Sequence, residues 1–156
     1  YRKETIAALK TRIQENNYTL YTGIFAARFL FEVLADVGEN ELTYKIMNQT
    51  EMPSFGSWIA DGASTTREYF DNHGSHNHPM FGGGLVWFYR KLAGMNADEN
   101  QPGYKHIIFK PQPAGDVSFV KYFTNTAYGK AGIHWERNGK EFRRCIMQKN
   151  IIQFMI

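Results

Sequence analysis

Ionisable and aromatic side chains concentrate in one short part of the sequence. Residues 59–70 contain two carboxylates, Asp61 and Glu68, with three hydroxyl side chains and an arginine between them. Carboxylates can move protons, and flat rings such as Trp58 and Phe70 can cover the apolar faces of a sugar. The segment is therefore typical of a pocket that hydrolyses glycosides. On composition alone, a solvated surface loop is the commoner interpretation of such a segment.

The first half of the chain has the apolar period of helices, which would have to position this segment. Apolar residues at positions 6, 9 and 13 predict a helix over residues 4–15. A second helix is predicted over residues 24–37, with Gly38 as its stop, and a third from Asn40. The second helix has little polar face, so we expect it to pack inside a larger helical array.

A fourth helix is predicted from Pro79 to Ala93, with Gly94 as its cap. Its interior contains three consecutive glycines at positions 82–84. Each glycine costs about 1 kcal/mol relative to alanine inside a helix. The three glycines therefore indicate close approach of another backbone or of a ligand.

After the polar segment 94–105 the apolar period changes from that of helices to that of strands. Strands are predicted over residues 106–110, 117–122 and 132–137. Asn138-Gly139 follows the last of these and predicts a hairpin with a type I′ turn, in which both central residues have positive φ.

The pattern predicts helices first and an antiparallel β module afterwards. We assign residues 1–93 to a helical domain, 94–105 to a linker and 106–156 to the β domain.

Composition excludes several classes of protein. The 156 residues are 43% hydrophobic and 15% aromatic, which is ample for a buried core. The net charge of +3 comes from scattered lysines and arginines, so no nucleic-acid partner is expected. No apolar run approaches the about 20 residues of a membrane span. The single Cys145 cannot form an internal disulfide, and Tyr1 is not an initiator methionine, so the true N-terminus is expected elsewhere.

Four stretches occur in a recognisable order: DGASTTREY at residues 61–69, SHNHPMFG followed by WFYR within 75–90, PGYKHIIFKPQP at 102–113 and TAYG at 126–129. In order and spacing they resemble the bacterial α-L-rhamnosidases of glycoside hydrolase family 78. The resemblance covers nearly the whole chain. It implies an α+β multidomain fold, with the C-terminal helices of an (α/α)₆ barrel followed by an antiparallel β-sandwich. Four helices cannot close a twelve-helix barrel, so a C-terminal fragment is expected.

The resemblance also implies a reaction, the inverting release of terminal α-L-rhamnose, with Glu68 as the general base. An inverting site needs a second carboxylic acid roughly 6.5–9.5 Å away. In the family that acid is a glutamate upstream of all four motifs, and Asp61, Glu32 and Glu51 match no acid motif. The chain alone is therefore expected to be inactive. No cofactor or metal is implied, because acid–base hydrolysis needs none.

The substrate-binding residues that the resemblance implies are His78, Trp58, Tyr69, Asn77 and Phe81. His78 and Asn77 belong to the family's Asn-His motif, and His78 is the candidate for contacting sugar hydroxyls, with a structural role as its alternative. The three aromatic residues are expected as pocket walls. Trp87 is a further candidate, but its place on a helix favours the core.

Two features depart from the family. Many members have tryptophans beside the base, whereas Arg67 and Tyr69 occupy those positions here, which leaves the substrate preference open. The segment 141–151 does not alternate as the family's last strands do, and it is followed by an apolar end.

Three alternatives stay open. His73, His76 and His78 could bind zinc, although their spacing does not put all three on one helical face. The chain could be a non-catalytic structural or carbohydrate-binding unit, or a glycosidase of another sugar specificity. If upstream helices are missing, the apolar faces of the helices at 24–37 and 79–93 would be exposed, and self-association is expected.

Overall fold

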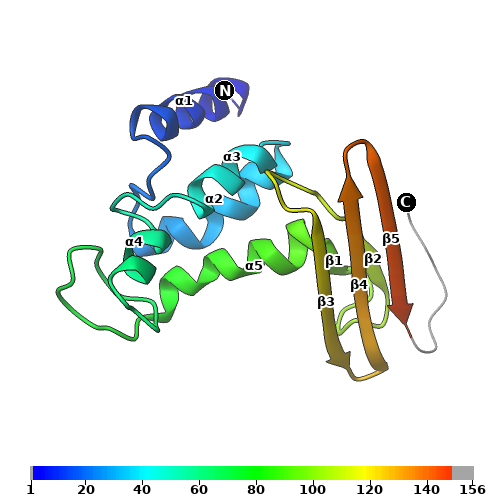
Figure 1. The fold of residues 1–156 in the computed structure, drawn as a ribbon. Coiled ribbons are helices and arrows are strands. Elements are labelled where there is room, and N and C mark those ends of the chain that lie inside the picture. Colours follow the sequence, from blue (N-terminus) through cyan, green and yellow to red (C-terminus); the bar gives the residue numbers. More distant parts are fainter. Residues whose placement is uncertain (1, 149–156) are drawn as a thin grey trace. The chain divides into compact units, whose positions relative to one another are not determined.

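The computed structural model describes residues 2–148, which form two compact units. One unit ends at Gly84 and is helical, and the other begins at Leu85 and contains all the described strands (Figure 1). None of the described helices is long and apolar enough to cross a membrane.

The helical unit contains the predicted helices and one that the sequence analysis missed. Its elements are α1 (Arg2–Glu15), α2 (Ile24–Asp36), α3 (Asn40–Met47), α4 (Phe55–Ala60) and the 3₁₀ helix η1 (Pro79–Gly84). The first three confirm the predicted helices. Helix α4 is only six residues long, too short for a period to show. Ser54 begins it as N-cap, accepting a 2.9 Å hydrogen bond from the backbone N–H of Ser57.

Helix α2 packs against η1 and α3 with one of its faces. Ala27, Phe31 and Leu34 are fully buried on that face. Phe25 and Phe29 lie elsewhere on the helix and are 74% and 57% exposed. Much of the apolar surface of α2 therefore has no cover in the described chain, and its packing inside a larger helical array stays a prediction.

The glycines of η1 permit its contact with α2. A Cβ atom on Gly83 would lie 2.8 Å from the Cα of Arg28, and one on Gly84 would lie 3.1 Å from the ring of Phe31. The predicted close approach of another backbone is confirmed. The predicted regular helix is not: residues 79–92 are helical, but the 3₁₀ helix η1 is followed by α5 (Leu85–Trp87) and then by the π-helix η2 (Phe88–Leu92).

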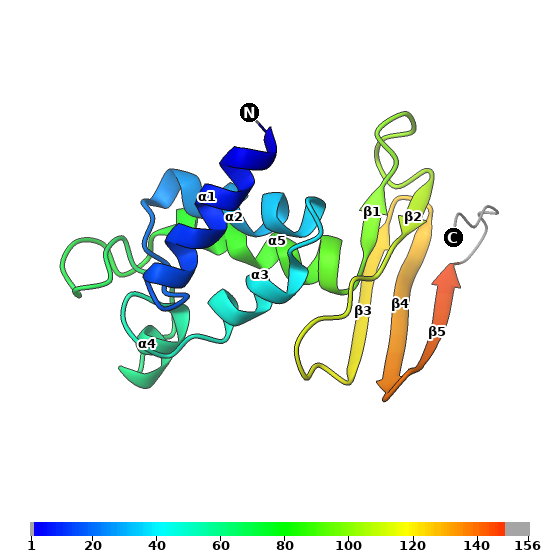
Figure 2. The ribbon, with the colours of Figure 1, turned by 90° about the horizontal axis from the view of Figure 1, so that it is seen from above.

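The second unit contains two antiparallel sheets. Strands β1 (Met95–Ala97) and β2 (Ile107–Phe109) form one of them, so part of the segment assigned to a linker, 94–105, is a strand. Strands β3 (Phe119–Thr126), β4 (Gly129–Asn138) and β5 (Glu141–Gln148) form the other, in that order (Figure 2).

The central strand β4 carries the core of the second unit. Ala131, Ile133 and Trp135 alternate along it and are buried. The indole N–H of Trp135 donates a 2.9 Å hydrogen bond to the carbonyl of Leu92, at the end of η2. Trp87 is also buried, as its core interpretation predicted.

The predicted hairpin between β4 and β5 is confirmed, but its turn type is wrong. Asn138 pairs with Glu141, so Gly139 and Lys140 are the central residues, and only Gly139 has positive φ, at 57°. That pattern is typical of a type II′ turn. Residues 141–148 form β5, although side chains 141–147 do not alternate between buried and exposed, in line with the interpretation of residues 141–151 as non-alternating. Residues 149–151 lie outside the described residues.

Candidate active site

The loop that follows α4 is held by hydrogen bonds between two of its own stretches. The backbone N–H of Glu68 donates to the carbonyl of Ser75 (2.8 Å), and that of His78 donates to the carbonyl of Thr66 (2.8 Å). The Thr66 hydroxyl returns a bond to the carbonyl of His78 (2.6 Å). These bonds bring the Glu68 segment beside the Asn-His segment, which lie about ten residues apart in the sequence.

The Glu68 carboxylate is positioned by the same loop. Its Oε2 accepts a 3.1 Å hydrogen bond from the backbone N–H of Ser75. Gly74 has φ of +76°, and a Cβ atom there would lie 2.9 Å from Oε2 and 2.8 Å from the Tyr69 ring. Among the described residues, Oε1 has no hydrogen-bond partner. One oxygen is thus fixed, and the other is available to a ligand or a water molecule.

A pocket of about 230 Å³ lies beside this carboxylate. Side chains of Glu68, Tyr69, Phe70 and Phe81 line it from the loop and η1. The segment that begins α2 supplies the rest of the lining, namely Thr22, Gly23 and Ile24. The pocket therefore has one acidic group, Glu68, in a lining that is largely apolar and aromatic.

A cluster of aromatic rings adjoins the lining of the pocket. Trp58 of α4 stacks on Phe70 with ring centroids 4.4 Å apart, and Phe81 meets both rings edge-on. Trp58 is only 4% exposed and does not line the pocket, whereas Phe81 belongs to both the cluster and the lining. Of the rings predicted as pocket walls, Tyr69 and Phe81 line the pocket, whereas Trp58 packs behind Phe70.

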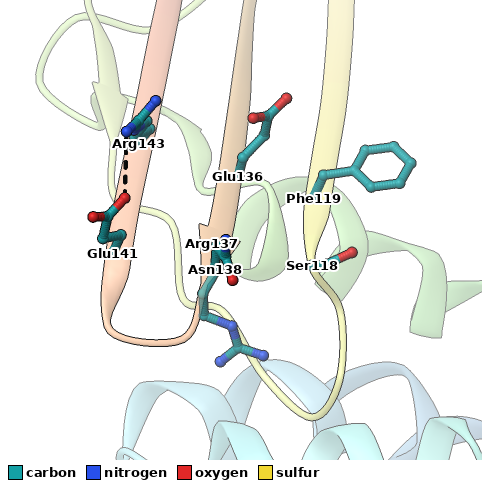
Figure 3. A pocket seen from close by; sticks show the side chains of 7 residues that line it. All are labelled: Ser118, Phe119, Glu136, Arg137, Asn138, Glu141 and Arg143. Atoms are coloured by element: carbon teal, nitrogen blue, oxygen red, sulfur yellow. Dashed lines mark hydrogen bonds and ion pairs between the residues drawn. The ribbon is translucent and has the colours of Figure 1, made fainter.

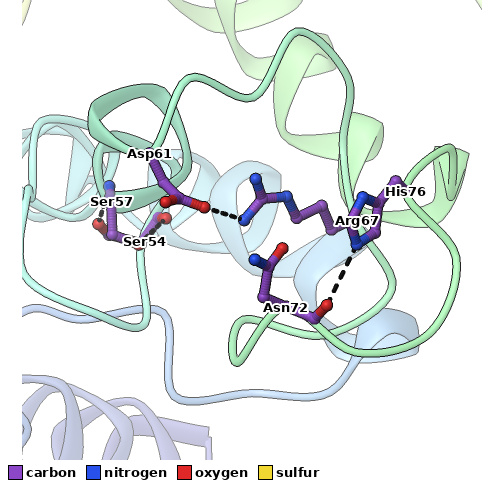
Figure 4. A network of polar contacts seen from close by, with 6 residues as sticks. All are labelled: Ser54, Ser57, Asp61, Arg67, Asn72 and His76. Carbon is purple, nitrogen blue, oxygen red and sulfur yellow. Dashed lines mark hydrogen bonds and ion pairs between the residues drawn. The ribbon is translucent and has the colours of Figure 1, made fainter.

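Arg67, one of the residues that departs from the family, is turned away from solvent. It is 8% exposed, and its guanidinium donates a 2.7 Å bond to Asp61 at the end of α4 (Figure 4). Because Asp61 is paired in this way, the ion pair ties the loop to α4.

The three histidines do not share a common site. His73 stacks on Tyr69 (4.0 Å) and pairs with Asp71, while His76 contacts the carbonyl of Asn72 (3.1 Å). His78 is half-buried, and its Nε2 is buried without a partner in the described chain. Within residues 2–148, no three His, Cys, Asp or Glu side chains gather as metal ligands.

Two family models match the chain in succession. The bacterial α-L-rhamnosidase 6 hairpin glycosidase domain matches residues 1–92, and the bacterial α-L-rhamnosidase C-terminal domain matches residues 94–146. The chain belongs to the bacterial α-L-rhamnosidase family. The fold class is confirmed: the last helices of a six-hairpin domain precede an antiparallel β domain.

Proteins of similar sequence and structure are α-L-rhamnosidases. The α-L-rhamnosidase of Streptomyces avermitilis is 26% identical over 161 residues, which cover 96% of this chain and 15% of that protein. The solved structure of α-L-rhamnosidase from Dictyoglumus thermophilum has a TM-score of 0.84 at 40% identity, covering 91% of this chain and 16% of that one. The Streptomyces avermitilis enzyme complexed with L-rhamnose has a TM-score of 0.78 at 25% identity, covering 85% and 14%. The chain thus spans about 15% of the length of the rhamnosidases it matches.

Two of the carboxylates that match no acid motif have other partners in the described chain. Asp61 is engaged by Arg67, and Glu51 accepts a 2.7 Å bond from Asn17.

Sequence reasoning missed several residues that shape the site. Thr22 and Gly23 signalled only the start of a helix, although they also line the pocket. Ser75 and Gly74 position Glu68 through the backbone, which no side-chain motif reveals. The positive φ of Asn72 (73°) and Gly74 (76°) bends the loop back, and an asparagine and a glycine two residues apart were the available signal.

Proposed function

We propose that this chain carries the general-base half of an inverting α-L-rhamnosidase site, with Glu68 as the base. One observation carries the proposal: Ser75 holds Oε2 of Glu68, while Oε1 has no partner among the described residues, beside a pocket of about 230 Å³. A base for water attack needs this arrangement, with an oriented carboxylate and one oxygen free to take the proton.

The lining of the pocket suits a 6-deoxy sugar. Rhamnose has a methyl group where common hexoses have a hydroxymethyl group, so one edge of its ring is apolar. Ile24, Phe70 and Phe81 supply apolar surface for that edge. Tyr69 is 45% exposed beside Glu68 and can cover a ring face. The apolar lining supports rhamnose over a hexose that carries a hydroxymethyl group.

We assign the polar contacts with the sugar hydroxyls to the Asn-His segment, although His78 and Asn77 do not belong to the lining of the pocket itself. The buried Nε2 of His78 has no protein partner in the described chain, and a buried polar atom costs free energy until it is paired. We assign it to a substrate hydroxyl. Asn77 is exposed, and its backbone N–H is bonded to the Ser75 hydroxyl (3.2 Å), which leaves its amide side chain for a second hydroxyl.

The general acid is expected outside this chain. An inverting reaction needs a protonated carboxyl on the far side of the sugar to assist the leaving group. Asp61 and Glu51 are engaged with other side chains, and the chain spans about 15% of its relatives. The 156 residues alone should therefore bind a rhamnoside without hydrolysing it.

The test is release of nitrophenol from an aryl α-L-rhamnoside, by the isolated chain and by the longest natural polypeptide that contains it. We expect activity only in the longer protein, and Glu68→Gln should lower its kcat by about 10²- to 10⁴-fold, the contribution of general-base catalysis. Glu51→Gln is the matched control and should leave kcat unchanged. Full activity of Glu68→Gln would refute the assignment of the base.

The stereochemistry is checked separately by proton NMR of the fresh product. Inversion predicts that β-L-rhamnose forms first from the α-linked substrate. First release of α-L-rhamnose would indicate a retaining reaction, and Glu68 would then be a nucleophile or a supporting group.

We also propose self-association of the isolated chain through α2. Phe25 and Phe29 are separated by one helical turn, and both are more than half exposed. Exposed rings side by side on a helix favour contact with a second apolar surface.

A further inference from the structure

A second pocket, of about 370 Å³, lies on the sheet of the second unit near the turn between β4 and β5 (Figure 3). Three of its residues form one row across the sheet, since Phe119 of β3 pairs with Glu136 of β4, which pairs with Arg143 of β5. Asn138 and Glu141 form the next row. Because paired residues and alternate residues of a strand share a face, all five side chains lie on one face.

This pocket is built on a fixed frame. The Arg137 guanidinium donates to the carbonyls of Gly115 (2.5 Å) and Val117 (3.3 Å), and its backbone N–H donates to the carbonyl of Ser118 (2.7 Å). These bonds hold the segment before β3 against the C-terminal end of β4. The backbone at one side of the pocket, residues 115–118, is thus fixed by the side chain and backbone of Arg137.

The chemistry of the row matches a sugar ring. Phe119 is 63% exposed and has no ring partner among the described residues, so its ring face is open to stacking on a sugar. Arg143 pairs with Glu141 (3.3 Å), and Glu136 pairs through one oxygen with His134 (3.1 Å). The second carboxylate oxygen of Glu136 and the other N–H groups of Arg143 can still bind sugar hydroxyls. Neighbouring strands lie about 4.8 Å apart, so the row spans about 10 Å, the size of one or two pyranose rings.

The charges of the pocket are balanced. Its lining contains two carboxylates, Glu136 and Glu141, and two guanidinium groups, Arg137 and Arg143. A phosphate or an acidic sugar would meet as much repulsion as attraction, whereas a neutral polyol can use donors and acceptors of both kinds. The lining shares no residue with the pocket of Glu68.

We propose that this face of the sheet is a non-catalytic binding site for a neutral saccharide, with Phe119 stacking on the sugar and Glu136 and Arg143 binding its hydroxyls. The site would keep the protein on a glycan while the reaction proceeds elsewhere. The proposal stands on the sheet alone and does not depend on the role of Glu68.

The test is saturation-transfer-difference NMR on the 156-residue chain, with methyl β-D-galactopyranoside and methyl β-D-glucopyranoside as probes. A rhamnoside is left out because the Glu68 pocket is expected to bind it. At least one probe should show transfer, and Phe119→Ala should weaken its binding about tenfold, as expected for the loss of a stacked ring. Tyr128→Ala removes an exposed aromatic from the turn between β3 and β4 and is the matched control, with unchanged binding. Glu68→Gln, also unchanged, separates this site from the proposed catalytic one.

Two outcomes would overturn the proposal. One is transfer to none of the probes, or transfer that survives Phe119→Ala. The other is binding of methyl α-D-galacturonide alone, abolished by 0.5 M salt as screening of charges requires, which would identify an anion site instead. Circular dichroism of each variant confirms that loss of binding is not loss of fold.

Discussion

The two pockets are held in different ways. Glu68 sits on an irregular loop, fixed by bonds from the loop's own backbone and by positive φ at Asn72 and Gly74. Glu136 sits on a strand, where the register with β3 and β5 determines its neighbours. Strand pairing positions a side chain without additional hydrogen bonds, because the bonds between the strands also hold the fold together. A loop can aim a carboxylate into a pocket, but it depends on a few special residues to do so.

The units also differ in how they cover their apolar surface. In the sheet unit the largest central side chain, Trp135, is fully buried with its N–H satisfied. In the helical unit, Phe25 and Phe29 of α2 stay exposed. A six-hairpin domain has further helices to cover such rings, and the chain spans about 15% of its relatives.

The largest expected effect comes from the core of the sheet. Trp135→Ala removes a fully buried ring and its bond to Leu92, so it should lower the free energy of unfolding by about 3–5 kcal/mol. Urea unfolding followed by circular dichroism measures it. Met147→Ala, on the neighbouring strand but 49% exposed, should cost under about 1 kcal/mol. An equal loss in both variants would mean that β4 is not the centre of the unit.

Gly74→Ala tests whether the loop aims Glu68. The new Cβ would meet Oε2 of Glu68 and the ring of Tyr69, so we expect kcat of the longer protein to fall about tenfold. Gly62→Ala is the matched control, because Gly62 has nearly the same φ (+74°) with no atom within 4 Å of the added Cβ. Both substitutions cost about 1 kcal/mol in backbone strain. Equal kcat for the two variants would show that Gly74 serves only the backbone.

Replacing Phe25 and Phe29 by serine tests the uncovered surface of α2. The double variant should shift the isolated chain from oligomer to monomer, because it removes two exposed rings and leaves the buried face intact. Light scattering at several concentrations measures the change. Phe119→Ser, an equally exposed ring on the sheet, should leave the association unchanged. A monomeric parent chain would contradict the proposal outright.

The smallest effect is expected at acid pH. The hydrogen bonds from His106 (2.7 Å) and from the backbone of Asn100 (2.9 Å) lower the pKa of the Asp98 carboxyl below its ordinary value of 3.8. The lowered pKa adds stability that is present above pH 3.8 and is lost as the pH falls through the folded-state value. Asp98→Asn should therefore flatten the fall in stability between pH 5 and pH 3. An unchanged acid profile would show that the carboxyl titrates alike in the folded and unfolded chain.

The sequence by itself determined the order of the elements. Periods of helix and strand located α1 to α3 and the strands, because a buried face repeats with the geometry of its element. Residues 62–69 and 75–82 also marked the segments that form the pocket, since side-chain type is what a motif records. The helix α4 escaped because its six residues are too few for a period to show. The strand β1 escaped because its three residues lie in a segment with the composition of a polar linker.

Tertiary structure decided which of these residues face a ligand. It placed Thr22 and Gly23 in one pocket lining with Glu68. It also stacked Trp58 on Phe70 and paired Arg67 with Asp61. It also aligned Phe119, Glu136 and Arg143, which are far apart in the sequence, in one row. Such placements depend on the packing of distant segments and on backbone hydrogen bonds, which no local pattern of side chains encodes.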